Sequence, residues 1–162
     1  MNSYTKTVVF SLMCGLLVVP AAASAASAIL ITDTVAMFTV EISIPTDTFE
    51  TELPIAASDK VLYNDRVNIT GFTIEDVNGE PVTGVTSKAL LLGTAAITTD
   101  NRYRVDIGTT ATFTLLIIST FDKAITEPYR ARITKLPYWL NGQRTSVHQN
   151  QLDEFVKPAL AI

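Results

Sequence analysis

The stretch VAMFTVEISI (residues 35–44) alternates apolar and polar side chains at almost every step. Side chains two residues apart share one face of a strand, so this period of two indicates a β-strand with one buried face. We expect Phe38, Val40, Ile42 and Ile44 to face the core, and Met37, Thr39, Glu41 and Ser43 to face away from it.

Two further segments carry strand patterns. In residues 66–76 the apolar side chains change parity at Gly71, which predicts a β-bulge there. Residues 110–120 begin as an alternation and continue as the unbroken apolar run LLII. Such a run is typical of a central strand that is buried on both sides.

The C-terminal third contains two more predicted strands. Residues 129–139 alternate so that Arg130 and Arg132, with Lys135, form a basic stripe on a solvated face. Balance against the acidic side chains explains this stripe better than an anion site does. Residues 154–162, EFVKPALAI, are expected to form a terminal strand at an edge or a bend, because they contain a proline.

Turn signals separate these runs at spacings of about 8–12 residues, which is the pattern of an all-β sandwich or barrel. The abundance of Thr, Val and Ile agrees with this interpretation. No linker or repeat interrupts the pattern. The sequence therefore predicts an all-β fold, a single antiparallel β-sandwich domain over residues 29–162.

Residues 1–28 have the pattern of a signal peptide, with Lys6, a continuous apolar run and then AAASAASA. Cleavage after Ala25 or after Ala28 satisfies the small-residue rule; the alternative is an uncleaved anchoring helix. Cleavage would remove Cys14, the only cysteine, so the mature chain is expected to form no disulfide. We expect a secreted protein, periplasmic or extracellular, with no integral membrane segment in the mature chain.

The charge balance restricts the partners. Loss of Lys6 with the leader lowers the formal net charge by one, from −4 to −5. Nucleic-acid-binding proteins carry basic patches, and anionic lipid attracts basic segments. We therefore expect no nucleic acid partner and no electrostatic adsorption to membranes.

The stretch TIEDVNGEPVTGV (residues 73–85) concentrates acidic side chains around a glycine. Asp76, Asn78 and Glu80 are weak candidates for a metal site, since oxygen ligands suit calcium, but the spacing departs from an EF-hand loop. Asn78-Gly79 between two β-like runs is a strong hairpin signal, because both residue types tolerate positive φ. We interpret the stretch as a turn and expect no metal.

Catalytic signatures are sparse. His148 is the only histidine, and no G-x-S-x-G motif accompanies it. A zinc site needs three or four ligands from His, Cys or carboxylates. A pair of carboxylates for glycoside hydrolysis stays as a distant third hypothesis, because no two acids stand out. We expect no enzymatic activity and no cofactor.

Tyr138 and Trp139 are adjacent, so in an extended strand they point to opposite faces. An exposed aromatic ring there would stack on a sugar ring, which makes both residues candidates for ligand contact. The alternative is that Trp139 fills the end of the core.

The segment FTIEDVNGEPVTGV (residues 72–85) resembles the D-x-N-G-x-P-V-x-G hairpin of bacterial immunoglobulin-like domains in exported surface proteins, such as invasin- and intimin-type adhesins. Residues 67–162 are similar to small secreted immunoglobulin-like modules of reduced-genome bacteria. The residues that match those modules are Asp106, Gly108, Phe113, Thr114, Leu115, Tyr129, Arg130 and Ile133. The resemblance implies an immunoglobulin-like sandwich, with Tyr129 at the place of a tyrosine corner.

Two functions follow as expectations. The first is a non-enzymatic cell-surface or envelope module for binding or adhesion, with a protein or glycan of the cell envelope as partner. The alternative is self-association as a structural subunit, in which residues 36–44 or 154–162 pair with the sheet edge of a neighbour.

Overall fold

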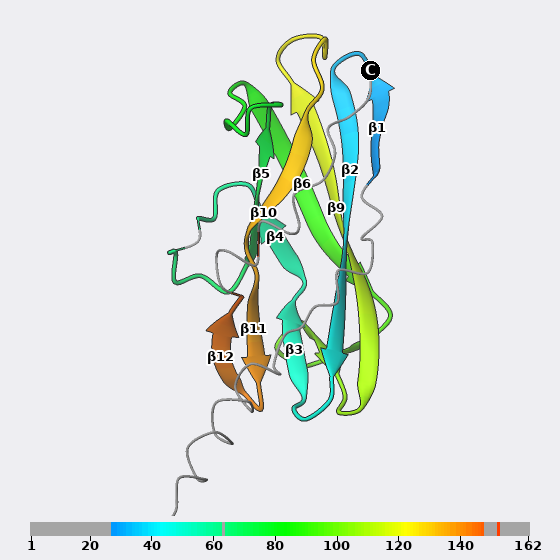
Figure 1. Cartoon of the computed structure of the whole chain (residues 1–162), viewed down its shortest axis with the longest axis vertical. Helices are drawn as coiled ribbons and strands as arrows, with labels where there is room; N and C mark the ends of the chain where they lie inside the picture. The colour runs from blue at the N-terminus through cyan, green and yellow to red at the C-terminus, as the bar shows by residue number, and fades with distance from the viewer. Residues whose placement is uncertain (1–26, 63, 148–151, 153–162) are drawn as a thin grey trace, which may run out of the picture.

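The computed structural model describes residues 27–62, 64–147 and Leu152, and these form two β-sheets packed as layers (Figure 1). The predicted all-β sandwich is confirmed at this level. All strand pairs are antiparallel except β4 with β5. The large sheet has the order β1 (Ser27–Thr32), β2 (Val35–Thr46), β9 (Thr109–Phe121), β6 (Val85–Gly93), β4 (Ala56–Ser58), β5 (Thr70–Glu75) and β10 (Arg130–Lys135). The small sheet has the order β12 (Gln143–Ser146), β11 (Pro137–Leu140), β3 (Thr51–Pro54), β8 (Arg102–Val105) and β7 (Ala96–Ile97).

The core lies between the two sheets and contains the inward set predicted for residues 35–44. In Figure 1, β3, β11 and β12 of the small sheet occupy the lower half of the molecule, while β1 and β5 lie in the upper half. Beyond β12, Val147 and Leu152 are both buried in this core. The largest fully buried side chains include Phe72, Phe113, Leu53, Leu91, Leu115, Ile117 and Ile133.

The pair β2–β9 is the longest ladder of the large sheet and runs in register from Val35↔Thr120 to Thr46↔Thr109. The prediction that residues 110–120 are buried on both sides is wrong. β9 alternates from Ala111 to Phe121, so Leu115 and Ile117 are fully buried, while Ile118 is 43% exposed on the other face. The small sheet packs on one face of β9 only, so the apolar run extends onto the outer face as well.

The bulge predicted at Gly71 lies on the neighbouring strand instead. β5 begins only at Thr70, and the register shift falls on β10 between Ile133 and Lys135, the residue that pairs with Gly71. A Cβ on Gly71 would lie 2.5 Å from the carbonyl oxygen of Val61. The glycine therefore allows close packing of two backbones. The parity change arises because residues 66–69 precede the strand, where Val67 is 41% exposed.

Residues 129–139 do not form one strand. The chain leaves the large sheet after β10, passes through the buried Leu136 and enters the small sheet as β11. Arg130 and Arg132 lie on the solvent side as predicted, but Lys135 does not continue the stripe, because it is buried at 3% exposure.

Three sequence predictions fall largely outside the described residues: the leader 1–28, His148 and the terminal strand 154–162. β1 includes Ser27 and Ala28, which precede the predicted start of the domain at residue 29. Among the residues that the structure describes, no helix is long and apolar enough to cross a membrane.

Candidate binding surface

The acidic stretch forms a turn whose polar groups satisfy one another. The amide of Gly79 donates to the carbonyl of Asp76 (3.2 Å), and the amide of Asp76 donates to the carbonyl of Glu80 (3.0 Å). Oδ1 of Asp76 accepts hydrogen bonds from the backbone amides of Asn78 (2.8 Å) and Glu80 (2.9 Å). Gly79 alone among these residues has positive φ, at 87°. This is a three-residue loop with glycine in the left-handed position, not a two-residue Asn-Gly turn.

These contacts determine what Asp76 does. The hydrogen bond from the backbone of Glu80, followed by those from Asn78 and Gly79, holds the pKa of the Asp76 carboxyl below its usual value. In the described part of the chain, no group of three or more His, Cys, Asp or Glu side chains is placed to hold a metal. Asp76 therefore stabilises the turn.

The first acidic residue of the stretch, Glu75, is buried between the two arginines of the predicted stripe. Its carboxylate is 3% exposed and lies 3.3 Å from Nη2 of Arg130 and 3.5 Å from Nη1 of Arg132. All three side chains stand on the outer side of the β5–β10 pair. The arrangement agrees with the interpretation of the stripe as internal charge balance.

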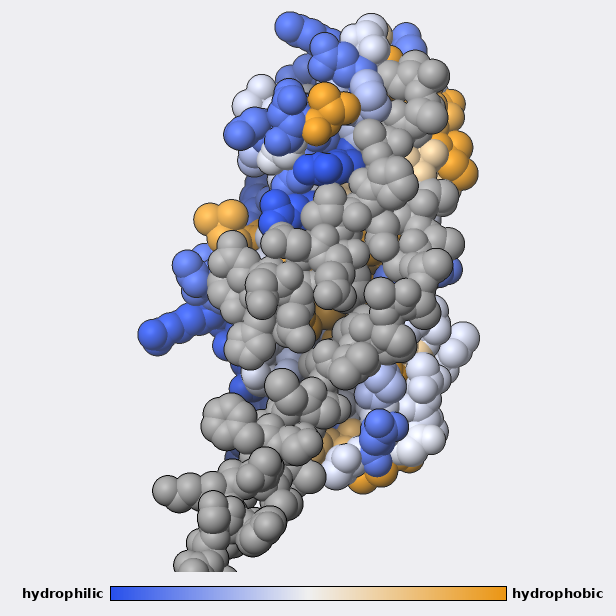
Figure 2. All heavy atoms as spheres, viewed as in Figure 1, coloured by the Kyte–Doolittle hydropathy of each residue, from blue (hydrophilic) through white to orange (hydrophobic). Residues whose placement is uncertain are grey.

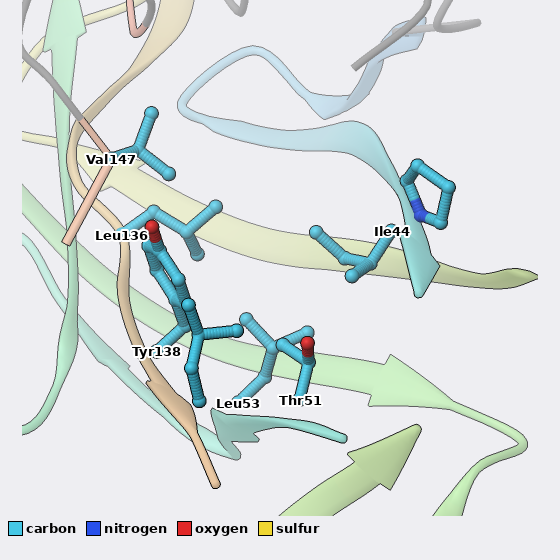
Figure 3. Close-up of a pocket in the computed structure, with 8 residues that line it drawn as sticks. Ile44, Thr51, Leu53, Leu136, Tyr138 and Val147 are labelled. Carbon is cyan, nitrogen blue, oxygen red and sulfur yellow. The ribbon is translucent and has the colours of Figure 1, made fainter. Parts of the chain in front are cut away.

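Tyr138 and Trp139 point to opposite faces of β11, as expected for adjacent residues. Tyr138 points inward and lines a pocket between the sheets together with Leu53, Leu136 and Val147 (Figure 3). The space open to the centre of a water molecule in this pocket is about 20 Å³. That is room for about one water molecule, and it is too small for a sugar ring.

Trp139 lies on the outer face of the small sheet but is only 5% exposed. The guanidinium of Arg102 sits 3.9 Å above the centre of its ring. Nη1 of Arg102 in turn binds Oε2 of Glu52 at 2.8 Å. A sugar ring would reach Trp139 only after Arg102 moves away.

The most unusual surface is the outer face of the large sheet. The strand register aligns Ile29, Met37 and Ile118 in one row across β1, β2 and β9, and Lys88 of β6 ends this row. In the next row Leu116 pairs with Leu90. The outer apolar face comprises Ile29 (50% exposed), Leu90 (44%), Ile118 (43%) and Leu92 (40%), with the half-buried Met37 and Leu116 between them.

Polar side chains border the outer apolar face. Thr114 pairs with Leu92 and Glu41, and Thr120 pairs with Thr86 beyond Lys88. An apolar centre with a polar rim is the usual anatomy of a protein–protein interface. Contiguous exposed apolar surface of this kind marks an interaction site more often than scattered single residues do.

The loops at the upper end of the large sheet form a second, polar surface. The β1–β2 turn accepts hydrogen bonds from the amides of Phe121 (to Thr34, 2.8 Å) and Ile125 (to Asp33, 2.6 Å). The amide of Asp122 donates to the carbonyl of Gly84 at 2.9 Å. An open hollow beside them is lined by Val82, Thr83, Gly84, Phe121, Asp122, Lys123, Ala124 and Tyr129. These loops are fixed to one another, and they bring no catalytic constellation together among the described residues.

No protein-family model, curated protein or solved structure matches this chain.

The outer apolar face was not identified from the sequence. Its signal was present in the run TLLIIST (residues 114–120), where Leu116 and Ile118 have the parity of the outward threonines. Apolar residues in both parities predict burial on both sides, which hides an exposed apolar face.

Proposed function

We propose that the protein is an exported, non-catalytic module that binds a protein of the cell envelope through the outer apolar face. The single observation that carries this proposal is the alignment of Ile29, Met37 and Ile118, with Leu90 beside them, on the solvent side of the large sheet. Burial of apolar area is the main favourable term in protein association.

A protein partner fits this surface better than a glycan does. Sugar recognition in an all-β module would use an accessible aromatic ring, and Arg102 covers the ring of Trp139. The outer apolar face instead offers aliphatic side chains with a threonine-rich border, which suits an apolar protein surface.

A non-catalytic role is supported by the structural use of the charged groups. Asp76 holds its turn, Glu75 pairs with two arginines, and Glu52 fixes the arginine above Trp139. Each of these carboxylates already has partners in the fold.

We also propose that the sandwich is immunoglobulin-like. Two face-to-face, mainly antiparallel sheets support this proposal, as does the aromatic pair at the predicted tyrosine corner, where the half-buried Tyr129 ring stacks on Phe121 at 5.0 Å. The large sheet of seven strands is wider than either sheet of an immunoglobulin domain, so the likeness is one of architecture.

The test is co-sedimentation of the purified mature protein with isolated cell envelopes over a concentration series. The face variant combines Leu90→Thr and Ile118→Thr, because threonine keeps the strand preference and removes apolar surface. The control is Ile107→Thr, at a residue 58% exposed in the β8–β9 turn. We expect saturable binding of the wild type and the control, and at least tenfold weaker binding of the face variant. Equal binding by all three proteins would overturn the proposal.

A further inference from the structure

β1 is an edge strand with an unusual composition for that position. In the described part of the chain it pairs with β2 on one side only. Its sequence, SAILIT, contains no charge and no proline, and Ile29, Leu30 and Ile31 are 50%, 40% and 53% exposed. In Figure 2, hydrophobic atoms gather along the upper right margin, where Figure 1 places β1.

The other three sheet edges carry features that discourage strand pairing. β10 bears Arg130, Arg132 and Lys135, β7 has only two residues, and β12 is a polar four-residue strand that includes Arg144. Charged side chains and short length are the devices by which proteins protect an edge. β1 has a register shift between Leu30 and Thr32, but residues 27–30 pair regularly with β2.

We propose that two copies of this chain associate through antiparallel pairing of their β1 strands about a two-fold axis at Ile29. The free edge of a strand offers a backbone donor and acceptor at every second residue, so its natural occupant is another strand. Antiparallel pairing about that axis sets Ile29 opposite its own copy and Ala28 opposite Leu30 of the other chain.

A second copy fits this edge for two reasons. An uncharged strand pairs with itself without repulsion, whereas pairing of β10 with its own copy would set arginines beside arginines. The two-fold pairing also joins the outer apolar faces. The row Ile118–Met37–Ile29 of one copy continues into the same row of the other, and Lys88 ends the joined row on both sides.

This pairing is distinct from envelope binding, and purified protein alone tests it. The first measurement is sedimentation velocity of the mature chain over a wide concentration range. We expect a monomer–dimer equilibrium that Ile29→Lys weakens at least tenfold, while Ile107→Lys leaves it unchanged. Both variants must retain the circular dichroism and the unfolding midpoint of a folded sandwich.

The second measurement tests the register. The mature chain is expected to contain no cysteine, so Ile29→Cys introduces a single thiol. Directly opposed residues of antiparallel strands have Cα atoms about 4.5–5.5 Å apart, which lies within the range for a disulfide.

Mild oxidation should crosslink Ile29→Cys at least ten times faster than Ile107→Cys. The proposal would be overturned if the wild type stays monomeric and Ile29→Cys shows no preferential crosslinking. It would also be overturned if the wild type forms oligomers larger than a dimer. If envelope binding persists in a monomeric protein, the proposed function stands and only this pairing is lost.

Discussion

Glu75 forms an ion-pair cluster with Arg130 and Arg132. We predict that removing the two arginines destabilises the protein more than removing the charge of Glu75. Glu75 is 3% exposed, whereas the two arginine side chains are 26% and 30% exposed. Replacing both arginines by methionine leaves a buried carboxylate without these partners. Replacing Glu75 by glutamine leaves two cations that water already reaches in part.

The magnitudes follow from burial. Removing the partners of a buried charge costs about 3–5 kcal/mol. The arginines are partly exposed, so the Glu75→Gln change is discounted for solvent screening to about 1–2 kcal/mol. The double variant Arg130→Met with Arg132→Met should therefore be the less stable of the two by about 2 kcal/mol.

Urea unfolding followed by tryptophan fluorescence measures both free energies of unfolding. Arg66→Met, at an exposed loop arginine, is a matched control and should change stability by less than about 0.5 kcal/mol. A Glu75→Gln variant that is as unstable as the double arginine variant, or less stable than it, would contradict this expectation.

Three further predictions concern the ends and turns of strands. Gly79→Ala forces alanine into a backbone with φ of 87°, so it should lower the free energy of unfolding by about 1–2 kcal/mol, and Gly79→Asn should recover part of the loss. The pKa of Asp76 is lowered in the folded state. The carboxylate therefore contributes to folding stability above its unfolded pKa near 3.8, and this contribution disappears as the pH falls through the folded pKa. The stability difference between wild type and Asp76→Asn, measured by urea unfolding, should therefore shrink between pH 6 and pH 2; a constant difference would count against this role. Finally, β1 includes Ser27 and Ala28, and Ala28 packs on the core, so we expect a chain that begins at Ala26 to be more stable than one that begins at Ile29. A chain that begins at Ile29 loses the pairs Ser27↔Thr39 and Ala28↔Phe38, so its free energy of unfolding, measured in urea, should be lower by about 1 kcal/mol; equal stability of the two chains would contradict this expectation.

The sequence predicted those features that depend on local alternation. The inward set of residues 35–44 and the outward position of Arg130 and Arg132 follow from a side-chain period of two, and the structure has both. The left-handed position at Gly79 follows from the absence of a Cβ atom.

The remaining features depend on tertiary packing. Parity shows which residues share a face, but it does not show which face another sheet covers, so the outer apolar face was interpreted as core. β4 and β7 have three and two residues, too few for any period. At the change of sheet the inward positions move from Ala131 and Ile133 to Leu136 and Tyr138, and a shift of parity alone does not show that the chain enters another sheet.

The proposed function is tested most directly by measuring whether water is excluded from the outer apolar face when the protein binds cell envelopes. A polarity-sensitive fluorophore attached at Ile118→Cys, with Ile107→Cys as control, reports this during titration with cell envelopes. We predict a saturable blue shift from position 118 and no shift from position 107. A protein that binds envelopes without any shift at position 118 would contradict the account.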